Sequence, residues 1–475
     1  MLTRAMPLLR SWLARLAIVP ALLLLASCGG GDGDDATPSP TPRTPTPVDT
    51  AATPTPAAPE TPYRLVYREY GAKEDIIWRV LAADPQQREK LTTIGHREGY
   101  GVVASISPDG RMLAYLSLPE DARSEDSSQA EAYVIDLKIA NNTKLIASGV
   151  DYRFKPLWSP DGQLLFMRRL AGPEILSADV SIIFTKVAHD PLEGEPTPTP
   201  TPKPTPVPAD QTPAPTPIPE DPIKTIMTAK YSQVLSFVPL GFSEDKRSLY
   251  FIQVNGGLQG TTLVGAYAPA TVEAILAEAT PTPAPEPTPT PDPNAPPTPT
   301  PKPNAKLIVT LTDQAGDDFS LSPDMHKVAF RASGLIEGQF VNQAFVSDLV
   351  AETVSPIKAD GLPPGDHLRP AWHPSSDWVA VGLLPSAAGP GRVAIVSIIG
   401  EPPQFLPAPA AGFDVPRAWS PDGTWLAVTH WSGESPANPG EASLELVALT
   451  GQRAHVAAGA KYDTENSIVG WFIPS

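Results

Sequence analysis

The residues of this 475-residue chain with the clearest chemical potential are a single cysteine, Cys28, and seven histidines. A lone thiol excludes an intramolecular disulfide and any metal site built from several cysteines. The histidines show no His-Glu-x-x-His spacing, and the sequence has no Gly-x-Ser-x-Gly turn, glycine-rich phosphate loop or EF-hand. We therefore predict no metal site, no cofactor and no enzyme activity of a recognisable type.

The chain begins with a segment typical of an export signal. Three arginines and no acidic residue accompany an apolar run at 16–25, and small residues follow at 26 and 27. A run of about ten apolar residues is too short to cross a bilayer as a lasting helix. The pattern predicts that residues 1–27 are a cleaved signal peptide.

The tetrapeptide Leu25-Ala26-Ser27-Cys28 resembles the bacterial lipobox. In that motif the cysteine thiol is acylated, and cleavage then leaves the cysteine as the first residue. The resemblance implies that Cys28 is lipidated and that the mature chain is extracytoplasmic, anchored by its lipid to the cell membrane or outer envelope. An ordinary secretory signal with a chance cysteine is the alternative.

The acidity of the chain limits its partners. Its formal net charge is −17, and loss of the three arginines within residues 1–27 would move it to −20. Nucleic acid repels such a chain unless a local basic patch is present, and no cluster of five or more Lys and Arg occurs. We therefore expect no nucleic-acid partner.

Proline is concentrated in three tracts. Residues 37–62 hold 9 of the 61 prolines, residues 196–222 hold 12 and residues 281–303 hold 12. Alternating proline and threonine prevents helix and sheet formation and favours the extended polyproline II conformation. We predict a lipidated cysteine and disordered tether at 28–62, and a folded body at 63–475 that carries disordered insertions at 196–222 and 281–303.

A short pattern recurs six times in that body: an apolar strand, a Ser-Pro-Asp-Gly turn and a second apolar strand. Clear copies contain Pro108, Pro160 and Pro421, and degenerate copies are centred on 244, 323 and 374. Proline presets the first central turn position, and glycine tolerates the left-handed conformation that ends the turn. Once the two internal tracts are removed, successive copies lie 47–57 residues apart. This period is typical of β-propeller blades.

The Trp-Ser-Pro-Asp-Gly repeat resembles the TolB-type, WD-like propeller repeat, and the resemblance covers residues 63–475. The resemblance is informative about the fold and says little about the function, because the matching residues build a turn. Each repeat offers four strand-like runs, and residues 467–472 resemble an inner strand with nothing after it. We predict an all-β fold: a single propeller of seven four-stranded blades, with six or eight as alternatives, closed where the C-terminal strand joins the first blade.

Side chains of the types that are common at binding sites occur in the loops that lead into the inner strands. The tether and both insertions should emerge on the face that bears the Ser-Pro-Asp-Gly turns, which leaves the opposite face free. Tyr, Arg, His and Asp in the free loops suit recognition, although ordinary solvated loops are the alternative. The candidate binding residues are His96, Arg97, Tyr100, Asp151, Tyr152, Arg153, Asp317, Asp366, His367, Arg369, Asp414, Arg417 and Tyr462.

These observations favour a membrane-anchored binding or scaffolding module. Its partner would be a protein, peptide or glycan on the face opposite the tether. One alternative is a propeller-type lyase or hydrolase, whose acids would converge at the mouth of the central channel. Another is a structural envelope protein whose glycosylated tracts matter most.

Overall fold

The computed structural model describes the part of the chain that forms strands. Its described residues are 62–122, 129–139, 142–171, 179–187, 223–230, 234–243, 249–255, 264–268, 306–312, 315–336, 339–362, 365–386, 389–458 and 468–472. All of them belong to one compact unit at 56–475. The predicted signal peptide, Cys28, the tether up to residue 61, both proline insertions and Tyr462 lie outside the described residues.

The described residues form strands and turns, with no α-helix. No helix capable of spanning a membrane occurs among them. The strands, in chain order, are β1 (Arg64–Glu69), β2 (Glu74–Leu81), β3 (Asp84–Gly95), β4 (Val103–Ile106), β5 (Met112–Ser117), β6 (Ala130–Asp136), β7 (Thr143–Val150), β8 (Leu157–Trp158), β9 (Leu164–Ala171), β10 (Asp179–Lys186), β11 (Ile223–Lys230), β12 (Val234–Phe242), β13 (Leu249–Asn255), β14 (Val264–Ala268), β15 (Lys306–Thr312), β16 (Ala315–Leu321), β17 (Lys327–Ile336), β18 (Gln339–Asp348), β19 (Thr353–Pro356), β20 (His367–Trp372), β21 (Trp378–Leu383), β22 (Val393–Ser397), β23 (Gln404–Phe405), β24 (Phe413–Trp419), β25 (Trp425–Trp431), β26 (Ala442–Ala448), β27 (Arg453–Ala458) and β28 (Ile468–Phe472).

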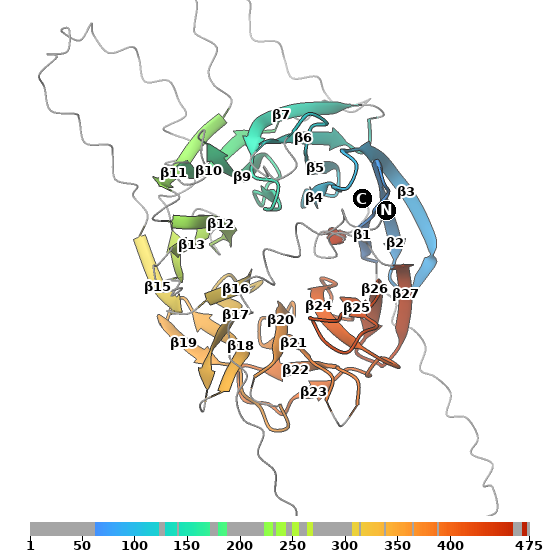
Figure 1. Cartoon of the computed structure of the whole chain (residues 1–475), viewed down its shortest axis with the longest axis vertical. Coiled ribbons are helices and arrows are strands. Elements are labelled where there is room, and N and C mark those ends of the chain that lie inside the picture. The colour runs from blue at the N-terminus through green and yellow to red at the C-terminus, as the bar shows by residue number, and fades with distance from the viewer. Residues whose placement is uncertain are drawn as a thin grey trace, which may run out of the picture. The chain divides into compact units, whose positions relative to one another are not determined.

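The strands pair as antiparallel meanders. Four sheets follow chain order, namely β12–β15, β16–β19, β20–β23 and β24–β27, and a fifth has the order β28-β1-β2-β3. An eight-stranded sheet contains β4–β7 and β8–β11, which are joined by the single pair Val150↔Arg169. Figure 1 shows the first strand of each meander innermost and the fourth outermost. This is the arrangement of β-propeller blades, as the repeat predicts.

The inner strands neighbour one another in sequence order. Strands β4, β8, β12, β16, β20 and β24 each contact the next inner strand, and β28 contacts both β24 and β4. Strand β28 also pairs antiparallel with β1, in the register Leu65↔Trp471. The C-terminal strand is therefore hydrogen-bonded into the sheet formed by the first three strands.

The repeated turns are built alike. The serine Oγ accepts a hydrogen bond from the backbone N–H five residues later, at 2.9 Å for Ser107, 2.8 Å for Ser159, 2.9 Å for Ser322 and 3.0 Å for Ser420. The glycine that ends the turn has φ of 72° at Gly110 and 71° at Gly423. The degenerate turns reach the same left-handed region without glycine, with φ of 62° at Met325 and 64° at Ser376. The copy centred on 244 lies outside the described residues.

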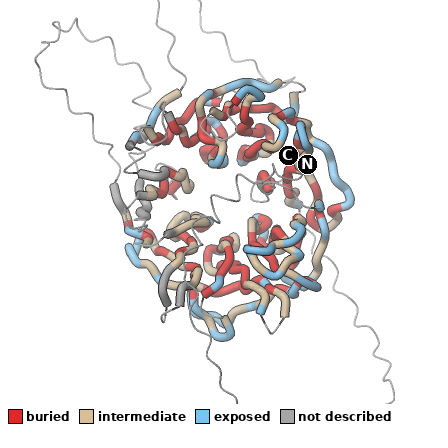
Figure 2. The backbone as a smooth tube through the Cα atoms, in the orientation of Figure 1, coloured by how far each residue is buried: buried red, intermediate tan, exposed pale blue. Residues whose placement is uncertain are grey.

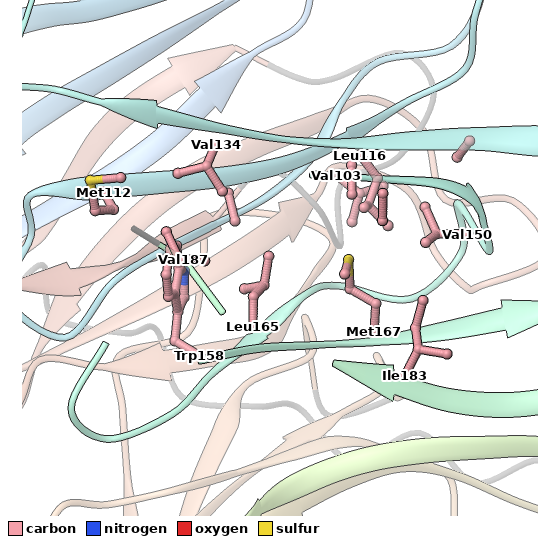
Figure 3. Close-up of a cluster of buried hydrophobic side chains, with 14 of the residues drawn as sticks. Val103, Met112, Leu116, Val134, Val150, Trp158, Leu165, Met167, Ile183 and Val187 are labelled. Atoms are coloured by element: carbon pink, nitrogen blue, oxygen red, sulfur yellow. The ribbon is translucent and has the colours of Figure 1, made fainter. Parts of the chain in front are cut away.

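Tryptophans at one repeat position join neighbouring meanders. The indole N–H of Trp158 donates to the carbonyl of Ser105 at 3.3 Å, and that of Trp372 donates to Ser320 at 3.0 Å. Each accepting carbonyl belongs to the preceding inner strand. Trp158 also packs in a hydrophobic cluster with Val103 of β4 and Leu165 of β9 (Figure 3). Packing against the preceding inner strand therefore accounts for Trp158 and Trp372.

Burial follows the same radial order. Strand β5 is buried along its whole length, whereas half of the residues of the outer strands β3 and β7 are exposed (Figure 2). The core thus lies between neighbouring sheets, where apolar side chains of one sheet meet those of the next.

Replacing Gly110 with alanine tests the docking of β28. A Cβ at Gly110 would lie 2.4 Å from Cδ2 of Phe472, the last residue of β28. Gly99 also has positive φ, 90°, but a Cβ there meets nothing within 4 Å. We expect Gly110→Ala to lower the free energy of unfolding by about 1–3 kcal/mol more than Gly99→Ala, measured by denaturant titration. Equal losses would show that Phe472 does not press on this turn.

Candidate functional site

The candidate residues lie at one end of the sheets. They occupy the loops that lead into β4, β8, β16, β20 and β24, or the first residues of those strands. The described strands that flank the predicted proline insertions meet the other end of the sheets: Lys186 of β10 pairs with Leu164 just after its turn. Ala268 of β14 pairs with Lys306 of β15 at the corresponding place. We call the end with the candidate residues the entry face.

The loop before β4 is fixed by a buried charge cluster. Asp75 accepts hydrogen bonds from the Val102 backbone N–H at 2.6 Å and from His96 Nε2 at 3.1 Å. Arg68 lies 3.5 Å from Asp75 and donates to the Val102 carbonyl at 2.6 Å. The side chains of Arg68, Asp75 and His96 are at most 1% exposed. His96, a predicted surface residue, is therefore part of the support of the loop.

The surroundings of His96 in this cluster favour its protonated form. Burial opposes its protonated form, but the hydrogen bonds to Asp75 and to the Arg97 carbonyl outweigh burial. The pKa of His96 is therefore raised above its ordinary value. The positive charge of Arg68 acts in the opposite direction.

Arg97, Tyr100 and Tyr152 lie close together. The Arg97 guanidinium donates to the Ala122 carbonyl and lies 5.3 Å from the centre of the Tyr100 ring. Tyr100 meets Tyr152 edge-on, with ring centres 6.4 Å apart. The Tyr152 hydroxyl donates to the Gly101 carbonyl, so the loops before β4 and β8 are joined.

Asp151 is a buried anion held by two arginines. Arg153 donates to it through Nε at 3.0 Å and Nη2 at 2.9 Å, and Arg168 Nη1 lies 3.3 Å away. Burial raises the pKa of Asp151, but the Arg153 hydrogen bonds and the Arg168 charge outweigh burial, so its pKa is lowered. The Arg153 side chain itself is 47% exposed.

Asp317 pairs within its own sheet. Arg331 of β17 donates to both of its carboxylate oxygens, at 2.8 and 2.6 Å, and also lies 3.2 Å from Asp318. Arg369 of β20 lies 4.0 Å from Asp318, so this carboxylate links two neighbouring sheets. The ion pairs of Asp151 and Asp317 thus involve arginines, and the described contacts do not join the two carboxylates.

The remaining candidates divide into buried and open residues. His367 is 1% exposed, and its Nδ1 accepts the Ala344 N–H at 3.2 Å, whereas the neighbouring Asp366 is exposed. Asp414 is buried against His430 at 3.0 Å and also contacts Arg453. Arg417 donates to Thr429 Oγ1 at 2.8 Å.

Sequence reasoning did not select several charged residues at this end, among them Arg68, Asp75 and Lys155. Lys155 precedes β8, and its ammonium donates to the carbonyls of Ile468 at 3.2 Å and Val469 at 2.6 Å. Its side chain keeps exposed surface although protein surrounds the ammonium. Burial and, secondly, the charge of Arg369 lower the pKa of Lys155 to about 8.

No grouping of three His, Cys, Asp or Glu side chains suited to a metal ion occurs in the part of the chain that the structure describes. The entry face therefore presents arginine, lysine, tyrosine and aspartate side chains on loops held by buried ion pairs.

Comparison with known proteins gives similarities of low sequence identity. No protein-family model matches the sequence, and no curated protein does. The structure is similar to TolB from Acinetobacter baumannii, with 13% identity and a TM-score of 0.38, over 74% of this chain and 64% of TolB. It is also similar to the β-propeller domain of the Trilobed protease from Pyrococcus furiosus, with 11% identity and a TM-score of 0.46, over 86% and 97% of the two chains.

A third similar structure is an oligogalacturonate lyase in complex with manganese, with 10% identity, a TM-score of 0.45 and coverage of 86% and 90%. The chain spans less than two thirds of the TolB chain. The assignment of this chain as a β-propeller rests on its own strand pairing, in which antiparallel meanders carry their first strand innermost.

Proposed function

We propose that this protein is a lipid-anchored, extracytoplasmic binding module whose entry face takes a protein, peptide or glycan partner. The observation that carries this proposal is the contrast at the entry face between buried supports and open recognition side chains. Asp75 and Asp151 are buried and hold the loops before β4 and β8, and Asp414 of β24 is buried against His430. Arg153 and Asp366 remain open to solvent. Rigid loops with open polar side chains favour binding, because little conformational entropy is lost on association.

The same contacts count against acid–base catalysis. A general acid needs a pKa near the working pH, whereas the arginines beside Asp151 lower the pKa of that carboxyl. Asp317 is engaged through both oxygens by Arg331. We therefore favour a binding module over the lyase or hydrolase alternative.

We further propose that the propeller has seven blades and a closed ring. Counting β4–β7 and β8–β11 as separate blades gives seven meanders, each with four strands. The pairing of β28 with β1 and the contacts of β28 with β24 and β4 support closure. Closure would remove exposed sheet edges, and edges of that kind promote aggregation.

The anchor and the insertions complete the proposal. We propose that Cys28 is lipidated after removal of residues 1–27, and that residues 28–62 serve as a spacer. We also propose that the insertions at 196–222 and 281–303 leave the propeller at the end opposite the entry face, because the strands that flank them adjoin the turns. The entry face would then remain accessible to a partner.

Capture of a partner by two matched variants tests the binding function. The full-length chain, Arg153→Ala and Lys138→Ala are used to retain proteins and glycans from an envelope extract. Each variant removes one cation; Arg153 lies on the entry face and Lys138 follows β6 at the other end. We expect Arg153→Ala to weaken retention about tenfold or more, as for loss of a charged hydrogen bond, and Lys138→Ala to leave it unchanged. No specific retention, or equal losses, would contradict the proposal.

A further inference from the structure

We propose that His96 is a pH-sensitive switch: its protonated ring holds the turn at 97–100 of the entry face in place, and loss of the proton releases that turn. The effect of this switch on a partner rests on the proposed binding function. The inference follows from the two hydrogen bonds of the imidazole ring, from the contacts of the turn and from the groups that surround the ring.

Both ring nitrogens of His96 face oxygen acceptors. Nδ1 lies 2.8 Å from the Arg97 carbonyl oxygen, and Nε2 lies 3.1 Å from Oδ1 of Asp75. The Asp75 carboxylate also accepts the N–H groups of Gly71 at 3.3 Å and Val102 at 2.6 Å. A neutral imidazole carries a single N–H, so only the protonated ring donates to both oxygens. The geometry therefore corresponds to protonated His96.

Loss of the proton converts one of the two contacts of His96 into a repulsion. The hydrogen bond to Asp75 is the stronger, because its acceptor carries a full negative charge. The remaining N–H therefore stays on Nε2, and Nδ1 then presents a lone pair to the Arg97 carbonyl. Two acceptors repel each other at 2.8 Å, so the peptide group that follows Arg97 must move away.

The Arg97 carbonyl closes the turn at 97–100. It accepts the Tyr100 N–H at 3.1 Å, so one oxygen joins the turn to the His96 ring. The Arg97 guanidinium lies 5.3 Å from the centre of the Tyr100 ring, and that ring meets Tyr152 edge-on. Movement of this carbonyl therefore displaces Arg97 and Tyr100, two half-buried side chains of the entry face.

The chain on either side of the turn has contacts that do not depend on the charge of the ring. The backbone N–H of His96 donates to the Lys73 carbonyl at 2.9 Å. Beyond the turn, Val102 donates to Asp75, and a Cβ at Gly101 would lie 2.8 Å from Oδ2 of the same carboxylate. Deprotonation of His96 therefore releases the turn while both ends of the loop stay attached.

The charged and titratable groups that face the His96 ring come from β1, β2 and the segment between them. Tyr70 stacks on the imidazole with ring centres 5.6 Å apart, and the buried pair of Arg68 and Asp75 lies beside it. Burial lowers the pKa of His96, but the hydrogen bonds to Asp75 and to the Arg97 carbonyl outweigh burial and the charge of Arg68. The pKa is raised, so the turn should be held below about pH 6.5 and released as the pH rises through the pKa of the folded protein.

Hydrogen exchange of the full-length chain in detergent, without any partner, tests the switch. Protection of the Tyr100 amide, corrected for the intrinsic exchange rate, is compared at about pH 5.5 and about pH 9, on either side of the transition. We expect protection to fall about tenfold or more at the higher pH, as for loss of a charged hydrogen bond. The Gly110 amide closes the turn at 107–110 by a 2.9 Å hydrogen bond to Ser107 and should keep its protection.

Two matched variants assign the effect to His96. His96→Gln replaces the titratable ring with a neutral amide, so its Tyr100 amide should show the low protection of the wild type at high pH under both conditions. His455→Gln makes the same change at an exposed position of the outer strand β27 and should keep the wild-type pH dependence. The comparison of Tyr100 with Gly110 in the wild type needs no substitution, so the test remains valid if His96→Gln fails to fold.

The effect on binding is measured by retention of the partner from the envelope extract at the same two pH values. Wild type should retain less partner at the higher pH, and His96→Gln should abolish the part of the difference that comes from the turn. Equal retention by wild type and His96→Gln at the lower pH would contradict control of binding by this turn.

Three results would overturn the switch itself. These are equal protection of Tyr100 at both pH values, a pH dependence that persists in His96→Gln, and its loss in His455→Gln. A pH-dependent turn that His96→Gln abolishes, with no partner retained at either pH, would support the switch and contradict the binding function. A retained partner together with a turn that does not respond to pH would support the binding function and contradict the switch.

Discussion

Replacing Cys28 with alanine is expected to abolish lipid attachment and to release the protein from the membrane. The chain has no other cysteine, so no second thiol can accept an acyl group. Each buried acyl CH₂ contributes about 0.8 kcal/mol to membrane binding, so several chains on one cysteine anchor a protein durably. The wild-type chain should incorporate radiolabelled palmitate and sediment with membranes when expressed in a bacterial host, and Cys28→Ala should do neither.

Ser27→Ala is the control for this experiment, because it keeps a small residue beside the same cysteine. It should retain both the label and the sedimentation. A Cys28→Ala protein that still sediments would mean that another part of the chain holds it to the membrane. A wild-type chain without label would favour an ordinary secretory signal.

Replacing Asp75 with alanine is expected to lower the free energy of unfolding by about 3–5 kcal/mol, because it leaves the buried Arg68 without its counter-charge. The substitution also removes the acceptor for the Val102 N–H and for His96. The loop that leads into β4 should become less ordered as a result. Denaturant titration of the full-length chain measures the loss.

The loss should depend on pH because His96 contacts Asp75. The pKa of His96 is raised in the folded protein, so its contribution to stability is fully present below its unfolded pKa of about 6.5 and is lost as the pH rises through the folded pKa. Asp75→Ala removes the carboxylate that stabilises protonated His96. The difference in stability between wild type and Asp75→Ala should therefore be larger at about pH 5.5 than at about pH 9.

Two further variants separate the effect of the buried charge on stability from the effect of a substitution in the loop. Glu98→Ala removes an exposed acid of the same loop, which lies 4.0 Å from Lys73, and should cost less than about 1 kcal/mol. The double variant Arg68→Met/Asp75→Leu removes both buried charges and should be less destabilised than Asp75→Ala. A loss in Asp75→Ala no larger than in Glu98→Ala would show that the cluster does not support the loop.

Much of the fold is predictable because its signals are local. A Ser-Pro-Asp-Gly turn between apolar strands contains its own hydrogen bonds, as the serine of each turn shows. Strand β28 was predicted as an inner strand because Trp471 lies one repeat length after Trp419. The antiparallel sheets of a propeller are confirmed by the strand pairing.

The site is less predictable because its contacts join residues far apart in the chain. Lys155 bonds to residues 313 and 314 positions away, and Val102 bonds to Asp75 across 27 positions. His96, Asp151, His367 and Asp414 were predicted in surface loops, yet all four are buried, and His367 and Asp414 lie at the start of strands β20 and β24. Polar groups that cap the ends of sheets lose contact with water and must find partners inside the protein. Residue type and position in a loop do not distinguish these supports from open residues such as Arg153.

Hydrogen exchange of the full-length chain, with and without the partner that it captures, tests the role of the entry face most directly. We expect the partner to slow exchange at residues 151–155 and 365–369, which carry Arg153, Asp366 and Arg369. Exchange at the turns 107–110 and 420–423 should be unchanged. Protection confined to those turns, with none in the entry loops, would contradict the account.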